Sequence, residues 1–153
     1  MRLLLALLLA AALAGAAGTT PAAATPSVGQ AAEAARVTLT VRASAFGRIL
    51  FDGQGRALYA FTRDRRGRSA CTGSCAAAWP PYLVRGTLRA GKGVRQGLLG
   101  TTRRPDGSRQ LTYRGRPLYY YVGDRRPGEV RCQNVFEFGG LWLVVRPGGR
   151  LVR

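Results

Sequence analysis

The sequence contains no histidine, and its one methionine is residue 1. Haem ligation by His or Met, type 1 copper, zinc sites that use His, and catalysis by Ser-His-Asp or Cys-His all need these residues. Carboxylates are also scarce, with 7 Asp and Glu in 153 residues. We therefore expect no metal site and no cofactor, and we interpret the protein as a non-enzyme.

Long apolar runs are missing except at the start of the chain. One arginine is followed by an apolar run from Leu3 to Ala17 that ends in small residues, which is typical of a secretory signal peptide. The run is too short to span a bilayer comfortably. We expect a signal peptide over 1–24, cleaved after Ala16 or Ala24, with a retained signal anchor as the alternative.

No cysteine lies near the expected cleavage region, so the chain has no lipobox cysteine to carry a lipid anchor. We expect a secreted, periplasmic or cell-envelope protein with no transmembrane span after processing.

Residues 25–36 are poor in large apolar side chains, and this favours a flexible leader. The β-rich domain is expected over 37–153, with repeats at about 45–100 and 101–153.

Negative charge is rare, and the formal net charge is +17. Of the 24 basic residues, only Lys92 is not arginine, and the arginines are scattered through turns and strands. This charge predicts non-specific attraction to polyanions at low salt. It does not predict specific nucleic-acid binding, because the basic residues form no block.

Strand signals dominate what is present. We expect a strand at 37–41 and three hairpins, which lie at 49–61, 110–121 and 141–152. Helix signal is limited to 74–79, which we expect to be capped by Ser74 and ended by Pro80 and Pro81. The sequence therefore predicts an all-β domain with little helix, a small sandwich or barrel-like sheet. A two-subdomain arrangement is the alternative.

The chain contains an internal repeat. Residues 55–66 align with 115–126, and the two stretches share Gly, Arg, Leu, Tyr, Asp, Arg and Arg in register. Each stretch carries a Tyr-x-aromatic-x-x-Asp motif, which comprises Tyr59, Phe61 and Asp64 in the first copy and Tyr119, Tyr121 and Asp124 in the second. We expect the two repeats to face each other around a pseudo-twofold axis.

The motif allows two interpretations. Residues two apart in a strand share a face, so Tyr59 and Phe61 should lie together, as should Tyr119 and Tyr121. The aspartates follow the strands, where a carboxylate accepts backbone N–H bonds in a turn. The motif is thus interpreted first as aromatic core plus turn cap, and second as an aromatic ligand surface with Asp64 and Asp124 at its rim.

At these residues the chain resembles a family of bacterial and archaeal secreted repeat proteins and lipoproteins defined by a repeated Tyr-x-(Phe/Trp/Tyr)-x-x-Asp motif. Further matching features are Cys71 to Cys75 followed by Trp79-Pro80-Pro81, Arg104 to Ser108, and Phe138 to Trp142. The resemblance covers about residues 45–150. It implies an exported location and a repeat architecture, but no chemistry, because the family is one of unknown function.

Three cysteines in an exported chain allow a disulfide. Cys71 and Cys75 flank one short loop, so we expect them to pair and Cys132 to be a free thiol. Pairing of Cys132 with either of the others is the alternative. A structural bridge is the first interpretation, and a redox-active pair is the second.

Two tryptophans complete the candidate residues. Trp79 precedes two prolines, and Trp142 lies in the last hairpin. In a small domain, large aromatics are needed in the core, so a groove that uses them is the second interpretation. We therefore expect an exported, non-enzymatic binding or structural module with an unknown small ligand or envelope partner. A thiol redox or electron-transfer accessory is the alternative, and a polyanion-binding protein ranks lower.

Overall fold

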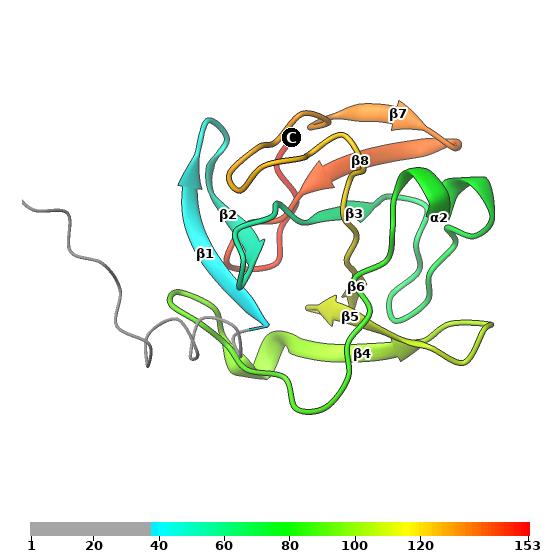
Figure 1. The fold of residues 1–153 in the computed structure, drawn as a ribbon, viewed down its shortest axis with the longest axis horizontal. Helices are drawn as coiled ribbons and strands as arrows, with labels where there is room; N and C mark the ends of the chain where they lie inside the picture. Colours follow the sequence, from blue (N-terminus) through cyan, green and yellow to red (C-terminus); the bar gives the residue numbers. More distant parts are fainter. Residues whose placement is uncertain (1–37) are drawn as a thin grey trace, which may run out of the picture.

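The structure is a computed structural model that describes residues 38–153, so the expected signal peptide and leader lie outside the described residues. Within 38–153 the strands form three small antiparallel sheets with the orders β1-β2, β3-β8-β7 and β4-β5-β6 (Figure 1). The strands are β1 (Leu39–Ser44), β2 (Gly47–Asp52), β3 (Tyr59–Phe61), β4 (Leu99–Arg103), β5 (Arg109–Tyr113), β6 (Arg116–Pro117), β7 (Val135–Glu137) and β8 (Gly140–Val144). The expected all-β class is confirmed.

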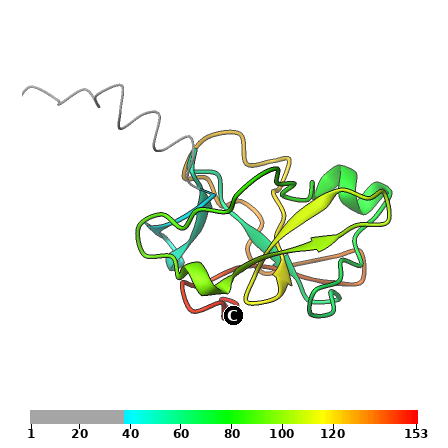
Figure 2. The ribbon, with the colours of Figure 1, turned by 90° about the horizontal axis from the view of Figure 1, so that it is seen from below.

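Helix is limited to α2 (Ser74–Ala78) and the 3-10 turn η1 (Gln96–Leu98). The two lie at opposite ends of the β4–β5 hairpin (Figure 2). The expected cap at Ser74 is wrong, because Ser74 is already helical and Gly73 takes the N-cap position without a side-chain bond. Trp79 ends the helix, as the two following prolines predict.

The three expected hairpins differ in how far they extend. The second is present as β5 and β6, and the third closes through the bridge between Val145 and Leu151. The first keeps its turn, where Asp52 Oδ1 accepts the amide N–H groups of Gln54 and Arg56. Beyond that turn β3 leaves β2 and pairs with β8 instead, with Tyr59 opposite Val144.

The segment between the repeats is placed by β1. The Thr38 amide donates to Arg89 O and the Val41 amide to Lys92 O, each within 3.0 Å. Leu39 also forms a parallel bridge with Ala90. The long connection between α2 and β4 therefore runs beside β1 before the chain enters β4.

The two repeats meet at their motifs, which is the contact that a pseudo-twofold arrangement predicts. Tyr59 and Tyr119 exchange both backbone bonds, each 2.9 Å from N to O. Tyr59 in β3 faces β8, near the chain end, while Tyr119 bridges Pro81, just after α2. Each motif therefore pairs with a segment of the other repeat, whereas the β1-β2 and β4-β5-β6 sheets each lie within one repeat.

Alternation along the motif strands divides the core into two layers. Tyr59, Phe61 and Tyr119 lie in a layer that also holds both tryptophans. Leu58, Ala60 and Leu118, one residue out of phase, lie in an aliphatic layer with members of β1, β2 and β5. The period of two explains why Tyr59 and Phe61 share one layer while Leu58 and Ala60 share the other.

Candidate functional site

The motif tyrosines are bonded across the repeats. Tyr59 Oη donates to Asp124 Oδ2 over 2.6 Å, and Tyr119 Oη donates to Asp64 Oδ2 over 2.8 Å. Each aspartate thus accepts the phenol of the other copy. A single copy of the motif would leave both groups without these partners, which is a physical reason for writing it twice.

The second oxygen of each aspartate closes a loop. Asp64 Oδ1 accepts the Ala70 amide over 2.7 Å, and Asp124 Oδ1 accepts the Arg131 amide over 2.9 Å. The aspartates therefore act as turn caps, as the first interpretation of the motif states. They also join the two repeats, which that interpretation did not include.

Burial controls the charge states of these pairs. It raises the pKa of Asp64 to about 6, although the hydrogen bonds from Ala70 and Tyr119 act in the opposite direction. Burial likewise raises the pKa of Asp124. It also raises the pKa values of Tyr59 and Tyr119, helped by the nearby carboxylates, so both phenols stay protonated donors.

Between the two pairs lies the aromatic stack, formed by Phe61, Trp142, Trp79 and Tyr121 in that order. Successive ring centroids are 4.3, 4.0 and 4.6 Å apart. Tyr59 meets Trp79 edge-on at 5.2 Å, and Tyr119 meets Trp142 edge-on at 5.1 Å. The arrangement repeats the pseudo-twofold symmetry of the backbone.

The stack fills the core instead of forming an open face. Phe61 is 2% exposed, and Tyr59, Tyr119 and both tryptophans are fully buried. Of the motif aromatics only Tyr121 is half-buried. The structure therefore leaves no open aromatic ligand surface at these positions, because the rings of each repeat are covered by those of the other.

The cysteines pair as expected, with Cys71 bonded to Cys75 at a Cα–Cα distance of 5.3 Å. Cys132 is a buried free thiol, and burial raises its pKa. Cys132 follows Arg131 as Cys71 follows Ala70, and these two preceding residues donate the matching amide bonds to the aspartates. The second repeat thus keeps one cysteine of the bridge.

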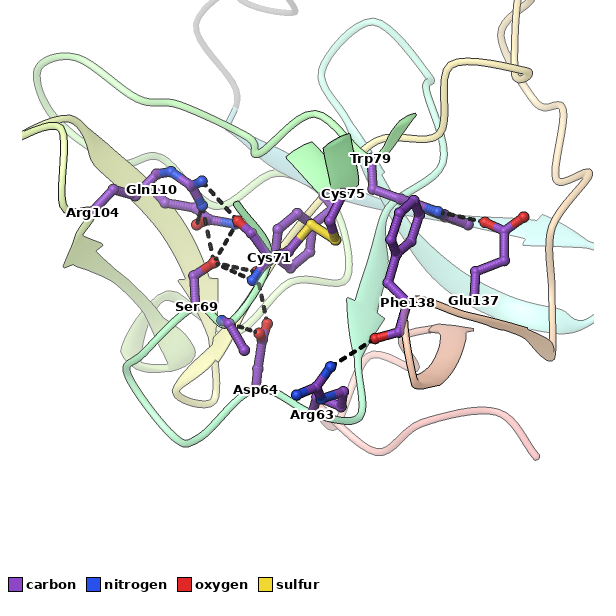
Figure 3. The surroundings of a disulfide bond; sticks show 12 residues. Arg63, Asp64, Ser69, Cys71, Cys75, Trp79, Arg104, Gln110, Glu137 and Phe138 are labelled. Atoms are coloured by element: carbon purple, nitrogen blue, oxygen red, sulfur yellow. Dashed lines mark hydrogen bonds between the residues drawn. A yellow bond between two sulfur atoms is a disulfide. The ribbon is translucent and has the colours of Figure 1, made fainter. Parts of the chain in front are cut away.

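A buried arginine holds the loop before the bridge. Arg104 is 7% exposed, and its guanidinium donates to Ser69 Oγ, Gln110 Oε1 and Cys71 O at 2.8 to 3.0 Å (Figure 3). On the other side Trp79 Nε1 donates to Glu137 Oε2 over 2.9 Å. Nothing in the local sequence pattern of Arg104 predicts that it is buried.

A pocket of about 420 Å³ opens beside the first motif, and we call it the arginine pocket. It forms where three turns meet: the loop after β3, the β5–β6 turn and the final hairpin turn. The Gly67 amide ties the first two turns together by donating to Gly115 O over 2.7 Å. Its lining residues are Phe61, Asp64, Arg65, Arg66, Arg114, Arg116, Pro117, Gly149 and Arg150.

The glycine of the β5–β6 turn lets an arginine lie across it. Gly115 has φ +75, and a Cβ added there would lie 2.6 Å from Arg66 Cγ. Arg114 is fixed on the opposite side, since it donates to Gly148 O over 2.9 Å. Five arginines and one acidic residue, Asp64, thus line the pocket.

The pseudo-equivalent turn of the second repeat carries a different charge pattern. The Gly128 amide donates to Gly55 O over 2.8 Å, which matches the Gly67 bond. Here Glu129 accepts the amides of Arg125 and Arg126 and forms a 3.0 Å ion pair with Arg131. The second turn thus has a carboxylate with an arginine ion pair, whereas no pocket arginine has an ion pair in residues 38–153.

Sequence reasoning included Phe61 and Asp64 of this pocket but missed its arginines. The sequence does contain the two turns that form the pocket, Asp-Arg-Arg-Gly at 64–67 and Arg-Gly-Arg at 114–116. They become neighbours only because the two repeats pack together, which the local sequence does not predict.

Within 38–153, no group of three or more His, Cys, Asp or Glu residues could hold a metal. The same stretch contains no helix long and apolar enough to cross a membrane.

Comparison with known proteins supports the repeat. A lipoprotein family model described as a secreted repeat of unknown function matches residues 40–82 and 100–146. The two matches correspond to the two halves that exchange strands in the structure. Searches of the curated proteins and of the solved structures gave no significant match.

Proposed function

The chain belongs to this family of secreted repeats of unknown function, and we propose that it is an exported, non-enzymatic binding module. Its ligand is an anion held in the arginine pocket. The description of the family and the disulfide both support export. The lack of histidine and the use of Asp64 and Asp124 as turn caps support binding over turnover.

One observation carries the proposal, namely the excess of guanidinium groups around the pocket. Five arginines line it, and Asp64 is the one carboxylate among its lining residues. Of the salt bridges in residues 38–153, none involves a pocket arginine. The positive charges of these arginines add up in a concave site, and an anion that enters the pocket is therefore attracted by all five.

The chemistry of guanidinium favours a phosphate-bearing ligand. Its planar fork of N–H donors matches phosphate oxygens in a bidentate manner, as it matches carboxylate oxygens. Several separately placed guanidinium groups suit a ligand with more than two acceptor oxygens. Phosphate groups of an envelope polymer and free polyphosphate share this chemistry. A binding assay with charge-matched variants separates specific binding of either ligand in the pocket from simple charge attraction.

The test compares two pairs of substitutions that remove equal charge. Arg116→Ala with Arg150→Ala removes two arginines of the pocket, whereas Arg125→Ala with Arg126→Ala removes two arginines of the second turn, outside the pocket. Tripolyphosphate binding is measured by titration calorimetry at physiological salt. Each charge-assisted bond contributes about 1.5 to 3 kcal/mol, so the pocket variant should bind at least about tenfold more weakly.

The control variant should bind within about twofold of the natural protein, because its arginines lie outside the pocket. Equal weakening by both variants would show that net charge, and not the pocket, attracts the anion. Absence of binding to tripolyphosphate and to a phosphate polymer would remove the proposal. Binding to the polymer alone would assign the ligand to the envelope.

The thiol redox alternative is less well supported by the geometry. Cys71 is fully buried and Cys75 is 6% exposed, so a thiolate partner cannot reach either sulfur without local opening. The bridge instead fixes the loop that carries Ser69 and Cys71 O, to both of which Arg104 donates. We therefore interpret it as a structural bridge.

A further inference from the structure

The motif tyrosines have surroundings that packing alone does not require. A buried phenol needs only a neutral acceptor, as Tyr113 shows by donating to Pro147 O. Tyr59 and Tyr119 instead donate to carboxylates, and each touches an indole ring edge-on. A phenol with a base at hydrogen-bond distance and a stacked indole pair beside it is equipped for one-electron oxidation.

We propose a further activity that does not rest on the arginine pocket: the aromatic core relays one-electron oxidising equivalents. An equivalent placed on the Trp79–Trp142 pair moves to Tyr59 or Tyr119. The phenol proton then passes to the carboxylate of the other repeat. The Tyr-x-aromatic-x-x-Asp motif thus supplies the electron donor, a stacking ring and the proton acceptor.

The step balances within the protein. A one-electron oxidant removes an electron from the indole pair and leaves a radical cation. Tyr119 then gives one electron to the indole and its Oη proton to Asp64 Oδ2, 2.8 Å away. The products are a neutral indole, a neutral phenoxyl radical and a neutral carboxylic acid. The proton acceptor lies within the range that proton transfer requires.

The two indoles differ in a way that gives the relay a direction. Trp79 Nε1 donates to Glu137, which can take the proton of an oxidised indole. Trp142 Nε1 is buried and has no hydrogen-bond partner among the described residues. An oxidised Trp142 therefore keeps its proton, stays the stronger oxidant, and is the one that touches Tyr119.

The stack also defines where an oxidant acts. Phe61 ends it on one side, and a phenyl ring is much harder to oxidise than an indole or a phenol. Tyr121 ends it on the other side, is half-buried, and stacks on Trp79 at 4.6 Å. A small oxygen-centred radical that reaches the exposed part of Tyr121 is the class of oxidant that this geometry admits.

The experiment uses the fact that both tryptophans of the chain lie in the stack. A short ultraviolet flash photoionises tryptophan, nitrous oxide captures the ejected electron, and tert-butanol removes the resulting hydroxyl radical. Transient absorption follows the indole radical and the phenoxyl radical. In the natural protein, phenoxyl should appear as the indole radical decays, at a rate independent of protein concentration.

Two control substitutions separate the relay from general tyrosine oxidation. Tyr120 donates to Asp52 over 3.1 Å but stacks with Tyr82, not with an indole, and Tyr113 has neither a carboxylate nor an indole partner. Tyr120→Phe and Tyr113→Phe should leave the phenoxyl yield unchanged. In a Tyr121→Phe background, which removes the third phenol in contact with an indole, Tyr59→Phe combined with Tyr119→Phe should lower it at least about fivefold.

A pH series tests the proton acceptor. In the Tyr59→Phe variant only the Tyr119–Asp64 pair remains, and burial raises the pKa of Asp64 to about 6. The phenoxyl yield should therefore fall as the pH is lowered through about 6. Asp64→Asn in this background should keep the yield low at every pH.

Two results would overturn the proposal. One is an undiminished phenoxyl yield in the folded Tyr59→Phe/Tyr119→Phe protein in the Tyr121→Phe background. The other needs no variant: in the natural protein, decay of the indole radical without phenoxyl formation, or at an equal rate in heavy water, excludes coupled proton transfer. The second test applies even if the double variant does not fold.

Discussion

The exchanged tyrosine–aspartate pairs predict which residues are energetically coupled. If the bonds run between the repeats, Tyr59 should couple to Asp124 and Tyr119 to Asp64. If each motif were self-contained, Tyr59 would couple to Asp64 and Tyr119 to Asp124. Four double-mutant cycles, with tyrosine changed to Phe and aspartate to Ala, distinguish the two arrangements.

The expected magnitudes follow from the contacts. A hydrogen bond to a charged group contributes about 1.5 to 3 kcal/mol, and Tyr59 Oη has its 2.6 Å bond to Asp124. Tyr59→Phe should therefore lower the free energy of unfolding by about 2 kcal/mol. Tyr119→Phe should cost at least as much, because Tyr119 Oη also lies 2.7 Å from Ser69 Oγ.

The coupling energies are the decisive quantity. For the two pairs in contact we expect about 1 to 2 kcal/mol, within the range found for bonded neighbours. For the two pairs within one motif we expect additivity to within about 0.5 kcal/mol. Guanidinium unfolding of the oxidised protein gives each free energy, and unchanged m-values show that the variants unfold from comparable states.

The result that refutes the reasoning is specific. Coupling within each motif that equals or exceeds coupling between the repeats would mean that the strands do not exchange in solution. Loss of all four couplings would mean that the phenols contribute only packing. Either outcome would also remove the basis for proton transfer between the repeats.

Three further predictions concern titration, the bridge and the core. Because the pKa of Asp64 is raised in the folded state, its contribution to the free energy of unfolding is present below the unfolded pKa near 3.8 and is lost as the pH rises through about 6. Asp64→Asn should remove this pH-dependent loss, which is at most about 3 kcal/mol, and measuring the free energy of unfolding against pH checks it. Replacing Cys71 and Cys75 by Ala opens a short loop and should cost about 2 kcal/mol on the chain-entropy model, and thiol titration of the natural protein should detect Cys132 only after unfolding. Trp142→Ala removes the ring between Phe61 and Trp79 and should cost about 3 to 5 kcal/mol, measured by thermal unfolding.

Much of the scaffold could be predicted from local pattern. The spacing of two between Tyr59 and Phe61 correctly placed both rings in one layer, and the turns supplied the hairpin positions. The disulfide followed from the closeness of Cys71 and Cys75 in the chain. Each of these features depends on residues a few positions apart, where sequence spacing fixes geometry.

The partners of the motif could not be predicted in the same way. Asp64 satisfies its turn locally, so the sequence contains no sign that its other oxygen binds Tyr119, 55 residues away. The pairing of β3 with β8 is equally non-local, and the expected first hairpin was too long for this reason. Arg104 is buried by distant contacts, although arginine is usually exposed.

The core is duplicated, whereas the surface differs between the two repeats. The backbone exchange, the tyrosine–aspartate pairs and the ring stack are all duplicated, and duplicated features suffice to build the scaffold. At the matching turns an arginine lies over each glycine, Arg66 over Gly115 and Arg42 over Gly55, but only the second turn carries a glutamate, Glu129, which pairs with Arg131. A structural role would act equally on both copies. The arginines of the first turn have no carboxylate that corresponds to Glu129, and the anion proposed as ligand would supply that negative charge.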